Sequence, residues 1–126
     1  MAVTIKSERE IALMRESCRI LSGVFDRMAE SIHPGMSTKD IDILGEKLIR
    51  EAGCIPNFKN YNGYPASVCT SVNDAVVHGI PKKKDILKEG DIVSLDAGFI
   101  YKGYHSDMAR TFAVAQISPE AQKLMD

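Results

Sequence analysis

Two aspartates, Asp96 and Asp107, are the residues whose placement in this chain first indicates chemistry. They lie in two stretches of strand-like composition, residues 91–100 and 104–114, on either side of the turn Tyr101-Lys102-Gly103. With Tyr101 and Lys102 as the central residues of that turn, Asp96 faces Asp107 across a β-hairpin, with Cβ atoms roughly 5 Å apart. Because like charges opposed in this way destabilise a sheet, the pair requires an explanation.

Three arrangements would relieve this repulsion. One carboxyl group keeps its proton, a basic side chain lies between the two, or a divalent cation binds both. Arg110 is close in sequence, but on its own strand it points to the face opposite Asp107. A fourth interpretation is that one aspartate caps a turn and the other is solvated, which is common in hairpins. The spacing alone leaves these alternatives open.

Two helices are predicted to precede the hairpin. Ser7 and Glu10 have the spacing of a capping box, and apolar residues then recur at steps of three and four. This periodicity predicts a helix over residues 8–31 with one buried stripe made of Ile11, Met14, Cys18, Leu21, Phe25 and Met28.

A second helix is predicted to begin at Ser37 or Thr38, after the break at residues 33–36. Gly53 stands where a left-handed C-terminal cap belongs. The buried side of this helix is predicted to consist of Ile41, Leu44, Leu48 and Ala52.

The middle of the chain changes in character. Residues 57–65 have the Asn, Gly and Pro content of a loop. Residues 66–80 alternate as strands do, which predicts a second hairpin that turns at Asn73-Asp74. Residues 81–90 form a charged connection.

The last residues contain the start of a helix. Ser118 is a capping residue, Pro119 suits the first helical position, and an acidic residue follows. The sequence has no corresponding stop signal before Asp126. We therefore expect the chain to end inside the helix that starts near residue 119, as a fragment would.

Composition narrows the class of protein. A chain of 126 residues with 44% apolar and 26% charged residues fits one compact, soluble domain. A net charge of -1 predicts no nucleic-acid partner, and the absence of a long apolar run predicts no membrane partner. The N-terminus lacks the pattern of a signal peptide, and the three cysteines show no metal or disulfide spacing. A cytoplasmic location is expected.

The sequence segments around the two aspartates, and two segments before them, resemble those of a known family. Four segments in this order, 60–69, 71–81, 93–98 and 103–112, are similar to segments of the type I methionine aminopeptidases. They include Val-Val-His-Gly-Ile-Pro, Val-Ser-Leu-Asp-Ala-Gly and Gly-Tyr-His-Ser-Asp. This resemblance implies an α+β structure that is half of a pita-bread fold, with two N-terminal helices followed by antiparallel β-hairpins. It also implies that residues 1–126 are the N-terminal half of the catalytic peptidase domain, truncated inside the helix that starts near residue 119.

The resemblance also implies roles for individual residues. Asp96 and Asp107 match the metal-bridging aspartates of a site that holds two divalent cations, with Co, Mn, Fe and Zn as candidates. His78 matches a catalytic histidine that hydrogen-bonds to the substrate near the scissile peptide. Three further residues match the walls of the methionine side-chain pocket: Tyr61, Tyr64 and Cys69.

The implied reaction is removal of the initiator methionine from nascent proteins by metal-dependent hydrolysis. A complete family member is roughly twice as long and is expected to be a monomer, and its second half supplies a histidine and two glutamates as further ligands. This chain alone is therefore expected to be inactive.

Two other hypotheses remain open. In the first, the chain is an inactive half-domain, and a homodimer of it would bring two copies of the Asp96–Asp107 pair together around a cation. Alternatively, it is a proline-specific relative such as an aminopeptidase P, which shares the fold but is disfavoured by the segment from Tyr61 to Cys69.

Overall fold

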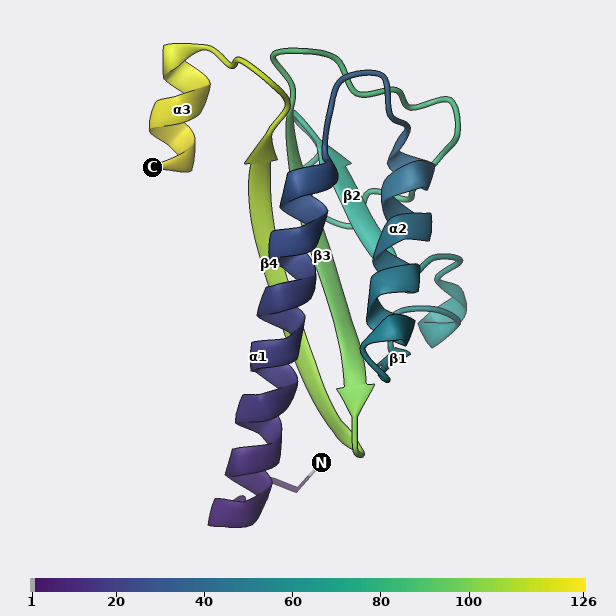
Figure 1. Ribbon diagram of the computed structural model, residues 1–126, viewed down its shortest axis with the longest axis vertical. Helices are drawn as coiled ribbons and strands as arrows, with labels where there is room; N and C mark the ends of the chain where they lie inside the picture. Colours follow the sequence, from purple (N-terminus) through teal and green to yellow (C-terminus); the bar gives the residue numbers. More distant parts are fainter. Residues whose placement is uncertain (1) are drawn as a thin grey trace.

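The computed structural model describes residues 2–126, which form a layer of helices on one face of an antiparallel sheet (Figure 1). The long helices are α1 (Glu8–Ser31) and α2 (Thr38–Glu51). The strands are β1 (Ile55–Pro56), β2 (Val68–Val72), β3 (Ile92–Tyr101) and β4 (Tyr104–Ala113). A 3-10 turn, η1 (Tyr61–Gly63), and a short helix, α3 (Pro119–Met125), complete the described part. None of the helices in residues 2–126 has the length and apolar character needed to cross a bilayer.

Strand β3 is the centre of the sheet. It pairs with β4 along its whole length, and β1 and β2 lie end to end along its other edge (Figure 1). The alternating residues Val93, Leu95, Ala97 and Phe99 of β3 are at most 1% exposed. They point toward the helices and form the core together with residues such as Phe25, which stacks on Phe112 at 6.4 Å between ring centroids.

Both predicted helix starts are confirmed. Ser7 and Glu10 form a complete capping box at α1, and Ser37 and Asp40 form another at α2. These reciprocal hydrogen bonds satisfy backbone N–H groups that the first helical turn leaves unpaired. Gly53 has a φ of +78°, so the predicted left-handed residue after α2 is also confirmed.

The predicted buried stripes are wrong in part. Ile11 is exposed because the first turns of α1 extend past the packed layer (Figure 1). Cys18 is exposed because the buried side of the helix begins at its neighbour Ser17 and continues through Leu21. On α2, Ala52 is exposed at the C-terminal cap, and Ile49 is buried in its place. Helical spacing alone does not reveal where along a helix its neighbours begin.

The predicted hairpin over residues 66–80 is wrong. Only β2 is a strand, and it pairs with β3 rather than with the chain that follows Asn73. Residues 75–80 form an irregular loop that runs beside β2 without a strand ladder; its contacts include the hydrogen bond from the Thr70 amide to the Gly79 carbonyl at 2.8 Å.

The hairpin of β3 and β4 exists, but its predicted register is wrong by two residues. Tyr101 pairs with Tyr104, so the central turn residues are Lys102 and Gly103, with φ of 48° and 85°. A tight hairpin turn of this kind requires positive φ at both central positions, which glycine adopts without strain. Asp107 consequently faces Gly98 rather than Asp96.

The helix predicted at the end of the described chain begins as expected. The Ser118 hydroxyl accepts a hydrogen bond from the Ala121 amide, and Pro119 is in the first turn of α3. No residue of α3 is buried, and the helix stands apart from α1 and α2 (Figure 1).

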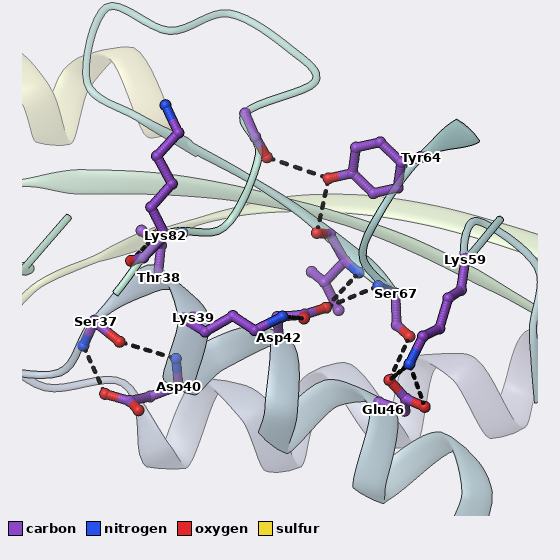
Figure 2. A network of polar contacts seen from close by, with 12 residues as sticks. Ser37, Thr38, Lys39, Asp40, Asp42, Glu46, Lys59, Tyr64, Ser67 and Lys82 are labelled. Carbon is purple, nitrogen blue, oxygen red and sulfur yellow. Dashed lines mark hydrogen bonds and ion pairs between the residues drawn. The ribbon is translucent and has the colours of Figure 1, made fainter. Parts of the chain in front are cut away.

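Asp42 on α2 fixes the start of β2. One oxygen of this buried carboxylate accepts hydrogen bonds from the backbone N–H groups of Ser67 at 2.8 Å and Val68 at 3.1 Å. The other accepts from Lys39 Nζ at 2.7 Å (Figure 2). The carboxylate thus satisfies two buried donors and links the helical layer to the strand that leads into the site.

Replacing Asp42 by alanine is expected to destabilise the protein by about 3 kcal/mol, because two buried N–H groups and a lysine would lose their acceptor. Urea unfolding measures the change. Asp26→Ala is the control: this carboxylate pairs with Arg110 but its side chain is 66% exposed, so its loss should cost less than about 1 kcal/mol. Equal losses for the two variants would contradict this role of Asp42.

Candidate metal centre and adjoining pocket

The candidate site lies on the face of the sheet that α1 and α2 leave uncovered. Cys69 pairs with Asp96 across β2 and β3, and Gly98 pairs with Asp107 across β3 and β4. Because side chains alternate along a strand, these residues share the face opposite to buried neighbours such as Leu95. A shift of two residues in register keeps every side chain on its predicted face, so both aspartates still lie on one side.

Asp96 and Asp107 are diagonal neighbours on this face, a relation that places Cα atoms roughly 7–8 Å apart and keeps the side chains within reach. Burial, and then the negative charge of Asp107, raise the pKa of Asp96 from 3.8 to about 6. The Oδ1 atom of Asp96 is buried and has no hydrogen-bond partner. A buried carboxylate oxygen normally has a hydrogen-bond donor or a cation beside it, so Oδ1 of Asp96 lacks the partner that such an atom requires.

Arg110 does not relieve the repulsion. As predicted, it points to the opposite face, where Nη1 binds Asp26 of α1 at 2.9 Å. Among residues 2–126, no lysine or arginine forms an ion pair with Asp96 or Asp107. Of the three arrangements that would relieve the repulsion, a retained proton and a bound cation therefore remain. Neither aspartate caps a turn, because both lie inside strands, but Asp107 is exposed as the fourth interpretation expected of one of them.

An open pocket of about 600 Å³ adjoins the two aspartates. The residues predicted to bind substrate and metal all line it, and the loop before β2 supplies much of its remaining wall. The lining consists of Phe58, Tyr61, Asn62, Gly63, Tyr64, Pro65, Cys69, His78, Ile80, Asp96 and Asp107.

His78 stands at the rim of this pocket on the irregular loop 75–80. Its φ of 59° is in the left-handed region, which is uncommon for a residue with a side chain. Gly79 beside it passes so close to β2 that a Cβ atom there would collide with the Thr70 carbonyl oxygen. The Gly79 amide also donates to Ser71 Oγ at 3.0 Å, so the backbone next to the exposed His78 is held against β2.

Tyr64 and Cys69 form the inner wall of the pocket. The Tyr64 hydroxyl donates to the carbonyl oxygens of Val68 at 3.0 Å and Gly79 at 3.3 Å, and thereby connects the two loops (Figure 2). Burial raises the pKa of Tyr64 and of the Cys69 thiol, so both are neutral groups at pH 7. Tyr61 also lines the pocket and is 70% exposed.

Comparison with known proteins decides the family. A profile of metallopeptidase family M24 matches residues 12–126. The chain belongs to this family. A methionine aminopeptidase of Clostridium acetobutylicum is 46% identical over 123 residues, which are 98% of this chain and 49% of that protein. Methionine aminopeptidase 1 of Bacillus subtilis is 44% identical over 124 residues, or 98% of this chain and 50% of that protein. The chain thus spans about half the length of the curated relatives it matches.

Solved structures of M24 peptidases share this fold. The methionine aminopeptidase of Rickettsia prowazekii superposes with a TM-score of 0.95 at 31% identity, over 98% of this chain and 50% of that chain. A Xaa-Pro dipeptidase of Bacillus anthracis superposes with a TM-score of 0.79 at 28% identity, over 94% of this chain and 32% of that one. The α+β, half-pita-bread architecture predicted from the sequence is confirmed.

The family is one of metallopeptidases, and the residues present fit a divalent cation in part. Carboxylate oxygens are suitable donors, and the unpartnered Oδ1 of Asp96 lies in the wall shared with the pocket. Among the described residues, however, no three His, Cys, Asp or Glu side chains are grouped closely enough to hold a metal ion. Asp96 and Asp107 therefore offer two ligands of a larger set.

Two carboxylates of α2 were missed by the sequence analysis. Asp42 and Glu46 are four residues apart, on one side of the helix, and both bind the chain at the start of β2 (Figure 2). The spacing itself is visible in the sequence, but it is equally typical of a solvated helix face, and nothing local identifies their partners 21 to 26 residues away.

The raised pKa of Asp96 has a consequence for stability. Its pKa is higher in the folded protein than in the unfolded chain, so ionisation weakens folding progressively as the pH rises from about 4 to about 6. Without metal at pH 7.5, Asp96→Asn is expected to raise the melting temperature by about 4 °C, which is about 1 kcal/mol after allowance for solvent screening. At pH 4 the gain should vanish.

Thermal unfolding followed by circular dichroism in the presence of a chelator measures this difference. Asp74→Asn removes an exposed carboxylate of the neighbouring loop and should change the melting temperature equally at the two pH values. A gain for Asp96→Asn that did not depend on pH would show that charge repulsion is not its cause.

Proposed function

We propose that this chain is the half of a methionine aminopeptidase that binds the substrate's first side chain and contributes two metal ligands. On this proposal, residues 1–126 are one half of the catalytic unit, and the complete protein removes the initiator methionine from nascent chains in the cytoplasm as a monomer. The observation that carries the proposal is the meeting of His78, Asp96 and Asp107 in one pocket.

Asp96 and Asp107 are proposed to hold divalent cations, two in the complete site, with Co, Mn, Fe and Zn as candidates. The repulsion between the two carboxylates and the lone Oδ1 of Asp96 support this assignment. When bound, a divalent ion supplies the nucleophile for peptide hydrolysis by acidifying water, and it stabilises the negative charge that develops on the carbonyl oxygen.

Tyr61, Tyr64 and Cys69 are proposed to receive the methionine side chain. The pocket offers aromatic faces and a neutral thiol, which suit a flexible thioether. Since Cys69 pairs with Asp96 on neighbouring strands, a side chain in this pocket would place the following peptide bond beside the carboxylates. The proposed pocket therefore selects the residue and orients the bond at the same time.

His78 is proposed to hydrogen-bond to the peptide next to the scissile bond. An imidazole can donate to the peptide group and stabilise the transition state at neutral pH. The left-handed backbone at His78, together with the close packing of Gly79, supports a position maintained for function rather than for packing.

Two aspartates in one copy are too few for a tight metal site, so the activity of the whole protein needs ligands from a second half. The alternative is a catalytically inactive half-domain, which as a homodimer would collect four aspartates. This alternative predicts a dimeric mass in solution and no peptidase activity.

The test measures release of methionine from a Met-Ala-Ser peptide with Mn²⁺ or Co²⁺. The chain is assayed alone and fused to the second half of the Bacillus subtilis relative. We expect the fusion to be active, the chain alone to be inactive, and His78→Ala to lower kcat of the fusion by about a hundredfold or more.

Two controls give the result its meaning. Asp107→Asn in the fusion removes a proposed ligand and should abolish activity, whereas a peptide that begins Ala-Pro tests for a proline-specific relative. Light scattering of the chain alone reports its mass. An inactive fusion, or full activity without His78, would contradict the proposed function.

A further inference from the structure

A carboxylate outside the pocket holds the pocket wall in place. Glu46 of α2 accepts hydrogen bonds from Lys59 Nζ with both oxygens, at 3.1 and 2.9 Å, and from Ser67 Oγ at 3.0 Å (Figure 2). Its own helix adds Arg50 Nε at 3.0 Å. Glu46 thus binds two separate points of the chain that follows α2, Lys59 and Ser67.

Lys59 and Ser67 bound the part of the loop that forms the pocket. The residues between them include Tyr61 and Tyr64, and this stretch contributes five of the eleven residues that line the cavity: Tyr61, Asn62, Gly63, Tyr64 and Pro65. Both ends of the segment 59–67 are therefore attached to the same carboxylate, while its middle faces the proposed methionine site.

The segment has little regular structure of its own. Its backbone bonds are local: the Asn60 amide donates to the Tyr64 carbonyl at 2.8 Å, and the Tyr64 amide donates to the Tyr61 carbonyl at 3.0 Å. Asn60 and Asn62 adopt positive φ of 66° and 48° on either side of Tyr61. Such a loop stays ordered through contacts with its surroundings rather than through a ladder of hydrogen bonds.

The contact at Glu46 is stronger than an ordinary surface ion pair. An isolated exposed pair contributes little, but here a side chain that is 22% exposed receives donors from α2, the loop and the start of β2. The hydrogen bond from Lys59 is the largest influence that lowers the pKa of Glu46 to about 2. The carboxylate therefore stays ionised, and charge-assisted hydrogen bonds of this kind are the stronger ones.

We infer that Glu46, through Lys59 and Ser67, is a positioning residue that keeps the segment 59–67 in the conformation that binds the substrate side chain. This inference rests on the proposed function for the identity of that side chain. On this inference, Glu46 controls the affinity for the substrate rather than the rate of the chemical step. If only a fraction of molecules have the segment in place, the observed dissociation constant rises in inverse proportion to that fraction.

The first experiment follows hydrogen–deuterium exchange in the 126-residue chain. In Glu46→Gln, the amides of Asn60, Tyr61 and Tyr64 are expected to exchange about tenfold faster, while amides in the middle of β3 keep their rates. Lys59→Met should reproduce the effect from the other side of the contact. It lies on an exposed loop and so tests the inference even if Glu46→Gln folds poorly.

Glu51→Gln is the matched control. Glu51 is on the same helix and pairs with Arg27 and Lys47 at 3.7 and 3.9 Å, but it does not touch the segment. Its loss should leave exchange in residues 60–64 unchanged. Unchanged exchange at these amides in both Glu46→Gln and Lys59→Met would overturn the inference, and so would faster exchange spread evenly over α2 and β3.

The second experiment uses the form of the protein that releases methionine in the assay described above. Glu46→Gln is expected to raise KM about tenfold and to leave kcat within about twofold, because substrate binding restores the ordered segment. A fall in kcat at constant KM would contradict this assignment. If no form releases methionine, the proposed function fails, and the exchange experiment still decides whether Glu46 orders the segment.

Discussion

The site depends on an unfavourable interaction. Asp96 and Asp107 share one face of the sheet, Asp96 is half-buried with an oxygen that lacks a partner, and no lysine or arginine among residues 2–126 forms an ion pair with either aspartate. A protein that gains nothing from this arrangement would be more stable with an amide at either position. On the proposed function this arrangement has a purpose, because the negative charge that weakens the metal-free fold would attract a divalent cation.

The remainder of the described chain holds this pair and its pocket in place. The helices cover only one face of the sheet, so the odd-numbered residues of β3 make the core and the even-numbered ones are free to form a site. Two carboxylates of α2 hold parts of the chain outside the core: Asp42 binds the start of β2, and Glu46 binds the loop that precedes β2. Stability and recognition are thus connected through one helix that does not itself line the pocket.

Local chemistry made part of this structure predictable. The capping box at Ser7, the cap at the start of the second helix and the glycine after α2 are short-range signals, and the structure contains them as expected. The common face of Asp96 and Asp107 was also predictable although the hairpin register was not, because alternation along a strand survives an even shift. Non-local features were not predictable: of the strand-like residues 66–80 only 68–72 form a strand, which pairs with β3, and no pattern indicates that Glu46 reaches Lys59 and Ser67.

The most direct test of the central claim is calorimetric titration of the metal-free chain with Mn²⁺ at pH 7.5, repeated on Asp107→Asn and on the exposed control Asp74→Asn. If the paired carboxylates exist to hold a cation, the chain and Asp74→Asn will bind with the same affinity, and Asp107→Asn will bind about tenfold or more weakly. Binding should also weaken below about pH 6, where a proton competes at Asp96. Equal affinity for the chain and Asp107→Asn would contradict the account.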